Sequence, residues 1–341
     1  MIHKNLIKLL SIQSLLCYPA ARATSMKLPL EAAEGRRSIV FDFDGTITQR
    51  DTIGAIAHHA ISHWLRRGRL VAPPEVEEEA RSKWKEIVDE YMAEYNLHVS
   101  SYSPAADERR EIDQEEAFLE SLRDVEQRSI ARVTESKFFD DLAPSDLEGF
   151  GREAFQRGKG KRMAGAEDEG AVELRRGFET FTEAVGNQGW KLGLVSVNWS
   201  GRFIKGVLGG LNSSAVADMD ILANEFHNGT IEGPEEVGRP LLTAYDKLEA
   251  LVRVWEKQGK QGTVYIGDSL TDLDCLLSAH LSIVISDSDE GKVVQTLRRL
   301  NHVVPHVTDA RLWFSKIVWA RDFAEIGESG VLDDWIYRTS E

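Results

Sequence analysis

Cysteine is scarce in this sequence: Cys17 and Cys275 are the only two among 341 residues. Neither stands at a spacing typical of metal ligands, and a single pair cannot form a disulfide framework. A zinc-finger fold and a disulfide-stapled scaffold are therefore excluded. Cys275 lies in an apolar helical stretch, where we expect a buried core residue, and this fits a reducing compartment.

Positively charged residues are also fewer than negatively charged ones. The chain carries 41 Lys and Arg residues against 56 Asp and Glu residues, which gives a formal net charge of -15. The sequence contains no basic stripe with interleaved aromatic residues that would attract a polyanion. We therefore expect no nucleic-acid partner, and an anionic small substrate would need a cation placed locally in its site.

Long hydrophobic runs are missing as well. The apolar stretch within residues 1–25 is short and interrupted by polar residues, so we expect no stable membrane span. Lys4 and Lys8 precede its leucine pairs, and no acidic residue comes before Glu31. These features leave open a mitochondrial targeting segment, a secretory signal, or an upstream extension with translation starting at Met26. We expect residues 1–36 to be a leader or a disordered extension, and we favour a cytoplasmic location.

Strand patterns are absent from residues 52–170, which carry apolar positions at helical spacing among many charges. The expected helices cover residues 53–70, 76–97, 107–139 and 145–157, and the Gly-rich residues 157–170 are expected to form a mobile surface loop. His59 and His63, one helical turn apart, are interpreted as a surface pair rather than as metal ligands. We assign residues 51–179 to an inserted helical domain.

Strands and helices alternate in the rest of the chain. We expect strands at 38–41, 190–197, 221–226, 263–266 and 281–285, a short hairpin around 229–231, and helices at 171–185, from 201, at 241–257 and at 270–279. This pattern predicts an α/β fold with a parallel, Rossmann-like sheet, built from residues 37–50 and 180–310. Residues 311–341 are expected to add a pair of helices; their large aromatic residues are Trp313, Phe314, Trp319 and Trp335.

Two carboxylates end the first expected strand. Asp42 and Asp44 are two residues apart, so they share one face of the strand, and Gly45 then makes the turn. The carboxyl ends of strands are where open α/β sheets bind ligands. This arrangement is typical of a phosphoryl-transfer site; the alternative is an acidic strand end followed by a simple turn.

Three further polar clusters fall at the same edge of the expected sheet. Ser196 ends the second strand, where its hydroxyl and nearby N–H groups could hold a phosphoryl oxygen or cap a helix. Lys247 is a single cation at the start of a helix with an apolar face. Asp268 follows another strand and Asp272 lies in the next helical turn, where an acid also stabilises a helix start.

In order, these clusters resemble the motifs of the haloacid dehalogenase (HAD) superfamily. The motifs are Asp42-Phe43-Asp44-Gly45-Thr46, Ser196, Lys247, and Gly267-Asp268 with Asp272. The helical insertion looks like the cap of the phosphoserine-phosphatase-like branch, although Arg176 replaces a proline that often precedes glycine there. The strings around residues 196–200, 223–226 and 264–269 resemble fungal cold-tolerance proteins most, and the phosphatase domain of plant thiamin monophosphate phosphatases.

The resemblance implies a role for each cluster. Asp42 would be the nucleophile and Asp44 the general acid and base; Thr46, Ser196, Lys247 and the loop N–H groups at Val197 and Asn198 would bind the phosphate. Asp42, the carbonyl of Asp44, Asp268 and Asp272 would hold Mg²⁺. Asp51 and Thr52 would lie at the hinge of the cap or face the leaving group, unless they only cap the helix that follows.

The implied activity is Mg²⁺-dependent hydrolysis of a small phosphate monoester through an aspartyl-phosphate. Two alternatives stay open: a phosphomutase of the same superfamily, and a non-catalytic protein that binds a phosphate ligand. Release of inorganic phosphate separates the enzyme from the binding protein, and a sugar bisphosphate exposes a mutase. The sequence leaves the substrate and the oligomeric state open.

Overall fold

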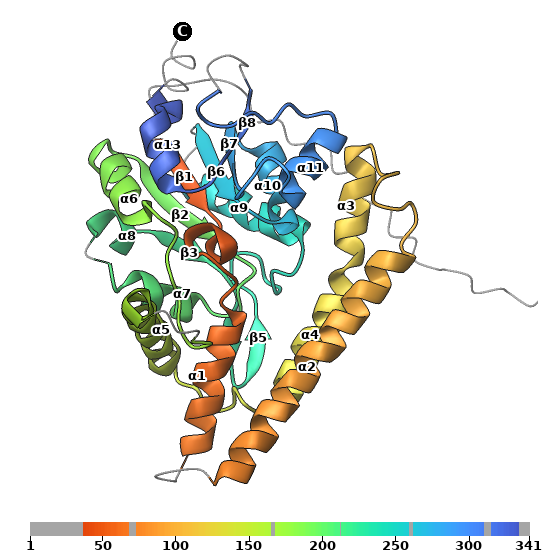
Figure 1. Ribbon diagram of the computed structural model, residues 1–341, viewed down its shortest axis with the longest axis vertical. Coiled ribbons are helices and arrows are strands. Elements are labelled where there is room, and N and C mark those ends of the chain that lie inside the picture. Colours follow the sequence, from red (N-terminus) through yellow and green to blue (C-terminus); the bar gives the residue numbers. More distant parts are fainter. Residues whose placement is uncertain are drawn as a thin grey trace, which may run out of the picture.

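The computed structural model describes residues 37–67, 73–164, 168–211, 213–258, 262–309 and 315–333. A six-stranded sheet in the order β3-β2-β1-β6-β7-β8 forms its centre (Figure 1). Every neighbouring pair of strands is parallel, so the predicted Rossmann-like sheet is confirmed. The strands are β1 (Ser38–Phe41), β2 (Lys191–Val195), β3 (Asp220–Leu222), β6 (Thr263–Gly267), β7 (Leu281–Ile285) and β8 (Ile317–Ala320).

Both faces of the sheet are buried under helices, as the uninterrupted apolar strands require. Ile39 and Phe41 of β1 point to one face, where Phe41 packs against Phe178 and Phe323. Val40 points to the other face. The first face is covered by α6 (Phe178–Asn187), α7 (Gly201–Leu208), α8 (Ser214–Ala217) and α13 (Phe323–Ser329), and the second by α9 (Ala244–Gln258), α10 (Leu273–Ser278) and α11 (Lys292–Arg299) (Figure 1).

Five helices, here called the inserted helices, lie between β1 and α6 in the described part of the chain. They are α1 (Ile53–Arg66), α2 (Pro74–Ser101), α3 (Ile112–Ser121), α4 (Arg123–Ser136) and α5 (Pro144–Ala164). No strand occurs in the described part of residues 52–170, as expected. The helix expected over 107–139 is divided at Leu122, and residues 157–164 continue α5, so the expectation of a loop there is wrong.

The segment that leads into the inserted helices and the segment that leads out of them lie side by side. Thr48 forms an antiparallel β-bridge with Leu174, and the Gln49 N–H donates to the Glu173 carbonyl at 2.9 Å. Residues 171–175 are therefore extended, and the helix expected over 171–185 begins only at Phe178. The division into core and inserted domain remains a prediction in its residue limits.

The expected pair of helices at the C-terminus is wrong in part. Residues 317–320 form β8, which pairs with β7 at the edge of the sheet, and only then does α13 begin. Trp319 lies on β8, with its ring 4.5 Å from that of His306. Trp313, Phe314 and Trp335 lie outside the described residues, as do residues 1–36 and Cys17.

Candidate active site

Three aspartates from separate parts of the chain meet at the carboxyl edge of the sheet. Asp42 follows β1, Asp268 follows β6, and Asp272 ends η2 (Leu270–Asp272), the short turn before α10. One oxygen of each carboxylate lies within 4.8 Å of the others. Among the described residues this is the one such group of acidic, His or Cys side chains, and the expected clustering of Asp42, Asp268 and Asp272 is therefore observed.

Glycine makes this close approach of the acids possible. Gly45 lies in η1 (Phe43–Ile47), the turn after β1, with φ of +73°, and a Cβ atom there would lie 2.2 Å from an oxygen of Asp268. A Cβ atom at Gly267 would lie 2.5 Å from the carboxyl carbon of Asp272. Both positions therefore exclude larger residues, the first by conformation as well as by space.

Lys247, in the first turn of α9, balances part of this negative charge. Its Nζ donates to Asp42 Oδ1 at 2.6 Å and pairs with Asp272 Oδ1 at the same distance. The side chain is fully buried. Burial alone lowers the pKa of a lysine, but the carboxylates of Asp272 and Asp42 outweigh it and raise the pKa of Lys247. Lys247 is therefore a fixed cation.

One lysine does not neutralise three carboxylates. Burial raises the pKa of Asp42 to about 6, against the opposing charge of Lys247, and burial with the charges of Asp42 and Asp272 raises that of Asp268 to about 8. Oxygen ligands with excess negative charge are what Mg²⁺ prefers. Asp42 and Asp268 fit this ion directly. Asp272 fits an outer role, because Tyr265 Oη and the N–H groups of Asp268 and Ser269 donate to its oxygens.

Asp44 lies beside the acid cluster in a different environment. Its Oδ1 accepts from the N–H and hydroxyl groups of Thr52 at 2.8 and 2.7 Å, and its Oδ2 accepts from Asn198 Nδ2 at 2.7 Å. Burial, followed by the charge of Asp51, raises the pKa of Asp44 to about 7. The carboxyl group can therefore hold a proton near neutral pH, as a general acid must.

The predicted phosphate-binding residues surround the same edge. Thr46 Oγ1 donates to Asp268 at 2.9 Å. Ser196 is fully buried and its hydroxyl accepts from the Asn198 N–H at 3.1 Å, so it does not cap a helix. Ser200 is the N-cap of α7 instead, because its hydroxyl accepts from the Phe203 N–H. The Asn198 side chain binds Asp44 and Thr52, which sequence reasoning missed.

Asp51 and Thr52 lie where the chain enters α1. The Asp51 carboxylate accepts from the Ile53 N–H at 2.8 Å, so the capping alternative describes this contact. Both residues also line a cavity of about 620 Å³ between α1 and α2, which Trp84 lines from the α2 side. Thr52 therefore both donates hydrogen bonds to Asp44 and lines the cavity.

Three residues that support the site were not predicted. The Tyr265 hydroxyl, on β6, donates to Asp272 at 2.6 Å. Asn224 joins two loops, because its amide donates to the carbonyls of Val197 and Leu241. The Arg175 guanidinium donates to the carbonyls of Gly45 and Thr46.

The histidine pair of α1 takes no part in the site. His59 is buried and shares a hydrogen bond of 2.9 Å with the Gly170 carbonyl, so the surface interpretation is wrong for this residue. His63 packs against Phe150. Neither belongs to a group of potential metal ligands within the described ranges.

Known proteins with similar sequences include two fungal relatives. The chain is 25% identical to a CTO1 family protein of Schizosaccharomyces pombe, covering 74% of this chain and 82% of that protein. It is 26% identical to cold tolerance protein 1 of Saccharomyces cerevisiae, covering 70% and 75%. The mitochondrial bifunctional TH2 protein of Arabidopsis thaliana is 23% identical, covering 79% of this chain and 43% of that protein. The expected relatives are confirmed.

Solved structures with a similar fold were also found. One of them is a phospho-aspartyl intermediate analogue of phosphoserine phosphatase. It is 19% identical with a TM-score of 0.44, and the match covers 86% of this chain and 99% of that chain. The family model of haloacid dehalogenase-like hydrolases matches residues 37–280, which is more than half of the sequence. The chain therefore belongs to the haloacid dehalogenase-like hydrolase family, and it is an enzyme of that class.

Proposed function

We propose that this protein is a Mg²⁺-dependent phosphatase that hydrolyses a small phosphate monoester through an aspartyl-phosphate on Asp42. The observation that supports it most is that Lys247 Nζ lies 2.6 Å from Asp42 Oδ1 and an oxygen of Asp268 within 4.8 Å of one of Asp42, with a protonatable Asp44 two residues from the nucleophile. A phosphoryl transfer needs a nucleophile, a proton donor and positive charge, and this edge of the sheet supplies a candidate for each.

The proposed reaction has two steps. A carboxylate oxygen of Asp42 attacks phosphorus, the bond to the ester oxygen breaks, and Asp44 gives its proton to that oxygen. Asp44, now ionised, takes a proton from water, which attacks the aspartyl-phosphate and releases inorganic phosphate. Lys247, Thr46, Ser196 and the N–H groups that follow Ser196 stabilise the phosphoryl oxygens during both steps.

The metal would be held by Asp42, the carbonyl of Asp44 and Asp268, with Asp272 in the outer role. Mg²⁺ bound there supplies positive charge that lets an anionic phosphate approach an anionic nucleophile. Thr46 Oγ1 donates to Asp268 and Lys247 Nζ donates to Asp42, and both bonds help to orient the proposed ligands.

The leaving group would occupy the cavity between α1 and α2. Thr52 connects that cavity with Asp44, so a group bound there lies next to the proton donor. We propose that the inserted helices, within residues 51–179, close over the site and select the substrate, with Asp51 and Thr52 at the hinge. We propose a small phosphate ester as the ligand of this cavity.

The experiment is a panel of phosphorylated sugars, amino acids and vitamins, with and without Mg²⁺, in which release of inorganic phosphate is measured. We expect turnover of at least one ester that requires Mg²⁺ and is abolished by Asp42→Asn, at least about 10³-fold, because the amide is not a nucleophile. Full activity in Asp42→Asn would contradict the mechanism. Transfer of phosphate within a sugar bisphosphate would indicate a mutase, and ligand binding without turnover a binding protein.

We also propose a cytoplasmic location. No described helix is both long and apolar enough to cross a membrane. The thiol of Cys275 is free and buried, which agrees with a reducing compartment. Fractionation of cells that carry the full chain with a C-terminal tag tests this, and a mitochondrial or secreted signal would contradict it.

A further inference from the structure

The turn that carries Lys247 is organised by its neighbour Asp246. The Asp246 side chain is fully buried, and its Oδ2 accepts from the N–H groups of Leu242 and Thr243 at 3.0 and 3.1 Å. The Lys247 N–H donates to the Thr243 carbonyl at 3.1 Å. The conformation of this single turn therefore fixes the point from which the Lys247 side chain starts toward Asp42.

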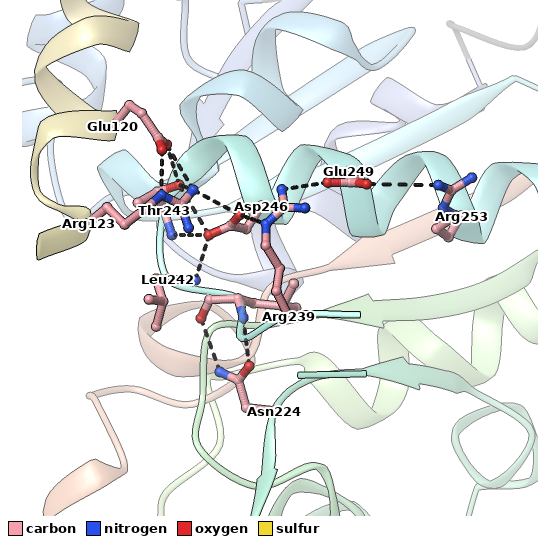
Figure 2. A network of polar contacts seen from close by, with 10 residues as sticks. Glu120, Arg123, Asn224, Arg239, Leu242, Thr243, Asp246, Glu249 and Arg253 are labelled. Atoms are coloured by element: carbon pink, nitrogen blue, oxygen red, sulfur yellow. Dashed lines mark hydrogen bonds and ion pairs between the residues drawn. The ribbon is translucent and has the colours of Figure 1, made fainter. Parts of the chain in front are cut away.

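Two arginines from different parts of the molecule bind the other oxygen of Asp246 (Figure 2). Arg239 comes from the loop that leads into α9, and Arg123 begins α4, one of the inserted helices; each donates to Asp246 Oδ1 at 2.9 Å. The Arg123 side chain is 21% exposed and that of Arg239 37%. The contact from the inserted helices is thus the more buried of the two.

The inserted helices hold the same turn by a second route. Thr243 Oγ1 donates to Glu120 at 2.8 Å and accepts from Arg123 at 3.1 Å, as Figure 2 shows. Glu120 in turn pairs with Arg123. Together Glu120, Arg123, Thr243 and Asp246 form a closed network, here called the α4–α9 clamp, which crosses from the inserted helices to the core.

We propose that Arg123 is a positioning residue that holds the first turn of α9 through Asp246, so that Lys247 Nζ stays between Asp42 and Asp272. The chain of contacts is short: Arg123 binds Asp246, whose backbone leads directly to Lys247, whose Nζ lies 2.6 Å from the nucleophile. The inserted helices thereby contribute to the charge at the phosphoryl group as well as to the substrate pocket. This inference rests on the proposed function.

The test compares Arg123→Gln with two matched controls. Arg132→Gln removes another arginine of α4, which pairs with Glu94 of α2 at 2.9 Å and does not reach α9. Arg239→Gln removes the partner of Asp246 that comes from the core side. In Arg123→Gln the buried Asp246 still pairs with Arg239, and Glu120, which loses its arginine, is 44% exposed, so we expect that variant to fold.

We expect kcat for p-nitrophenyl phosphate to fall roughly 10- to 100-fold in Arg123→Gln with little change in KM, because a displaced lysine fails mainly in the transition state. Arg123→Lys should recover part of this loss, and Arg132→Gln should stay near the original rate. A normal kcat in Arg123→Gln with only a lower melting temperature would overturn the proposal. An equal loss of kcat in Arg239→Gln would also overturn it, because removal of either positive charge beside Asp246 would then have the same effect, whichever element carries it.

A second readout does not need turnover. Crystal structures of the original protein and of Arg123→Gln should differ in the separation of Lys247 Nζ and Asp42 Oδ1, which we expect to grow by roughly 1 Å in the variant, the scale at which catalysis suffers. An unchanged separation overturns the positioning role. Absence of turnover in the original protein, with this displacement present, would contradict the proposed function and leave the clamp supported.

Discussion

At the scale of single residues, the site combines charges that do not cancel. Lys247 pairs with Asp42 and Asp272, so the remaining negative charge of the three aspartates calls for a further cation or for protonation of a carboxylate. The residue types and their order in the sequence predicted this cluster correctly. The supporting contact from Tyr265 could not be predicted, because a tyrosine in an apolar strand gives no sign of what its hydroxyl meets.

Replacing the proton donor should affect poor leaving groups most. In Asp44→Ala, we expect the first-turnover rate for an alkyl phosphate to fall by about 10²- to 10⁴-fold, and that for p-nitrophenyl phosphate to fall much less, because p-nitrophenolate leaves without a proton. Rapid-mixing measurements of the first turnover separate this step from hydrolysis of the intermediate. Equal losses for both esters would contradict the assignment of Asp44 as general acid.

Adding one methyl group at Gly45 should damage the site. Gly45→Ala places a Cβ 2.2 Å from Asp268 at a positive φ, so we expect loss of Mg²⁺-dependent activity and about 1 kcal/mol or more of destabilisation. Gly327→Ala on α13 is the matched control, since no atom lies within 4 Å of its Cβ position; it should keep activity and gain up to about 1 kcal/mol. Chemical denaturation of both variants measures the difference.

At the scale of elements, apolar runs were predicted well and long-range pairing was not. The strand at 281–285 is observed within its expected limits because five buried residues in a row define it locally. β8 was missed because its place depends on pairing with β7, as between Ile283 and Val318. The start of α6 was misplaced because Leu174 pairs with Thr48, a contact that the local sequence of 171–175 does not encode.

The C-terminal elements should lose stability when Glu325 loses its charge. Burial opposes ionisation of Glu325, but its bonds to Arg321 and His306 outweigh this and lower its pKa from 4.5 to about 2. A lowered pKa stabilises the fold above the unfolded value, and this stabilisation disappears as pH falls from about 4.5 through about 2. We expect Glu325→Gln to lower the free energy of unfolding by about 1 to 3 kcal/mol at pH 7.

The same comparison near pH 2 should show almost no difference between Glu325→Gln and the original protein. Denaturation at both pH values measures it. Glu328→Gln is the control, because that side chain is exposed on the same helix. A difference that persists unchanged at low pH would show that packing rather than charge holds α13.

At the scale of the whole molecule, the site exists only because the sheet brings distant segments together. β1 and β6 are neighbours although more than two hundred residues separate them, and Asp42 and Asp268 follow their ends. The order of motifs predicted this meeting, since parallel strands share one edge. The α4–α9 clamp was not predictable, because nothing in the charged sequence around Arg123 distinguishes a buried partner from solvent.

Metal binding should stabilise the folded chain as a whole. A ligand that binds only the native state at 100 times its Kd adds about 2.7 kcal/mol, so Mg²⁺ should raise the melting temperature in a concentration-dependent way. Asp268→Asn should reduce or abolish that shift and weaken the metal dependence of activity. Differential scanning calorimetry with and without Mg²⁺ measures this, and a full shift in Asp268→Asn would remove that residue from the ligand set.

The bridge between Thr48 and Leu174 restricts how the inserted helices can move relative to the sheet. At this bridge the two crossing segments run antiparallel and are joined by hydrogen bonds, which resist sliding of one segment along the other. Sliding of the inserted helices along the core would have to break these hydrogen bonds as well as the α4–α9 clamp. A displacement of residues 48–52 would also move Thr52, four residues from the bridge, and so change the two hydrogen bonds that it donates to the Asp44 carboxylate.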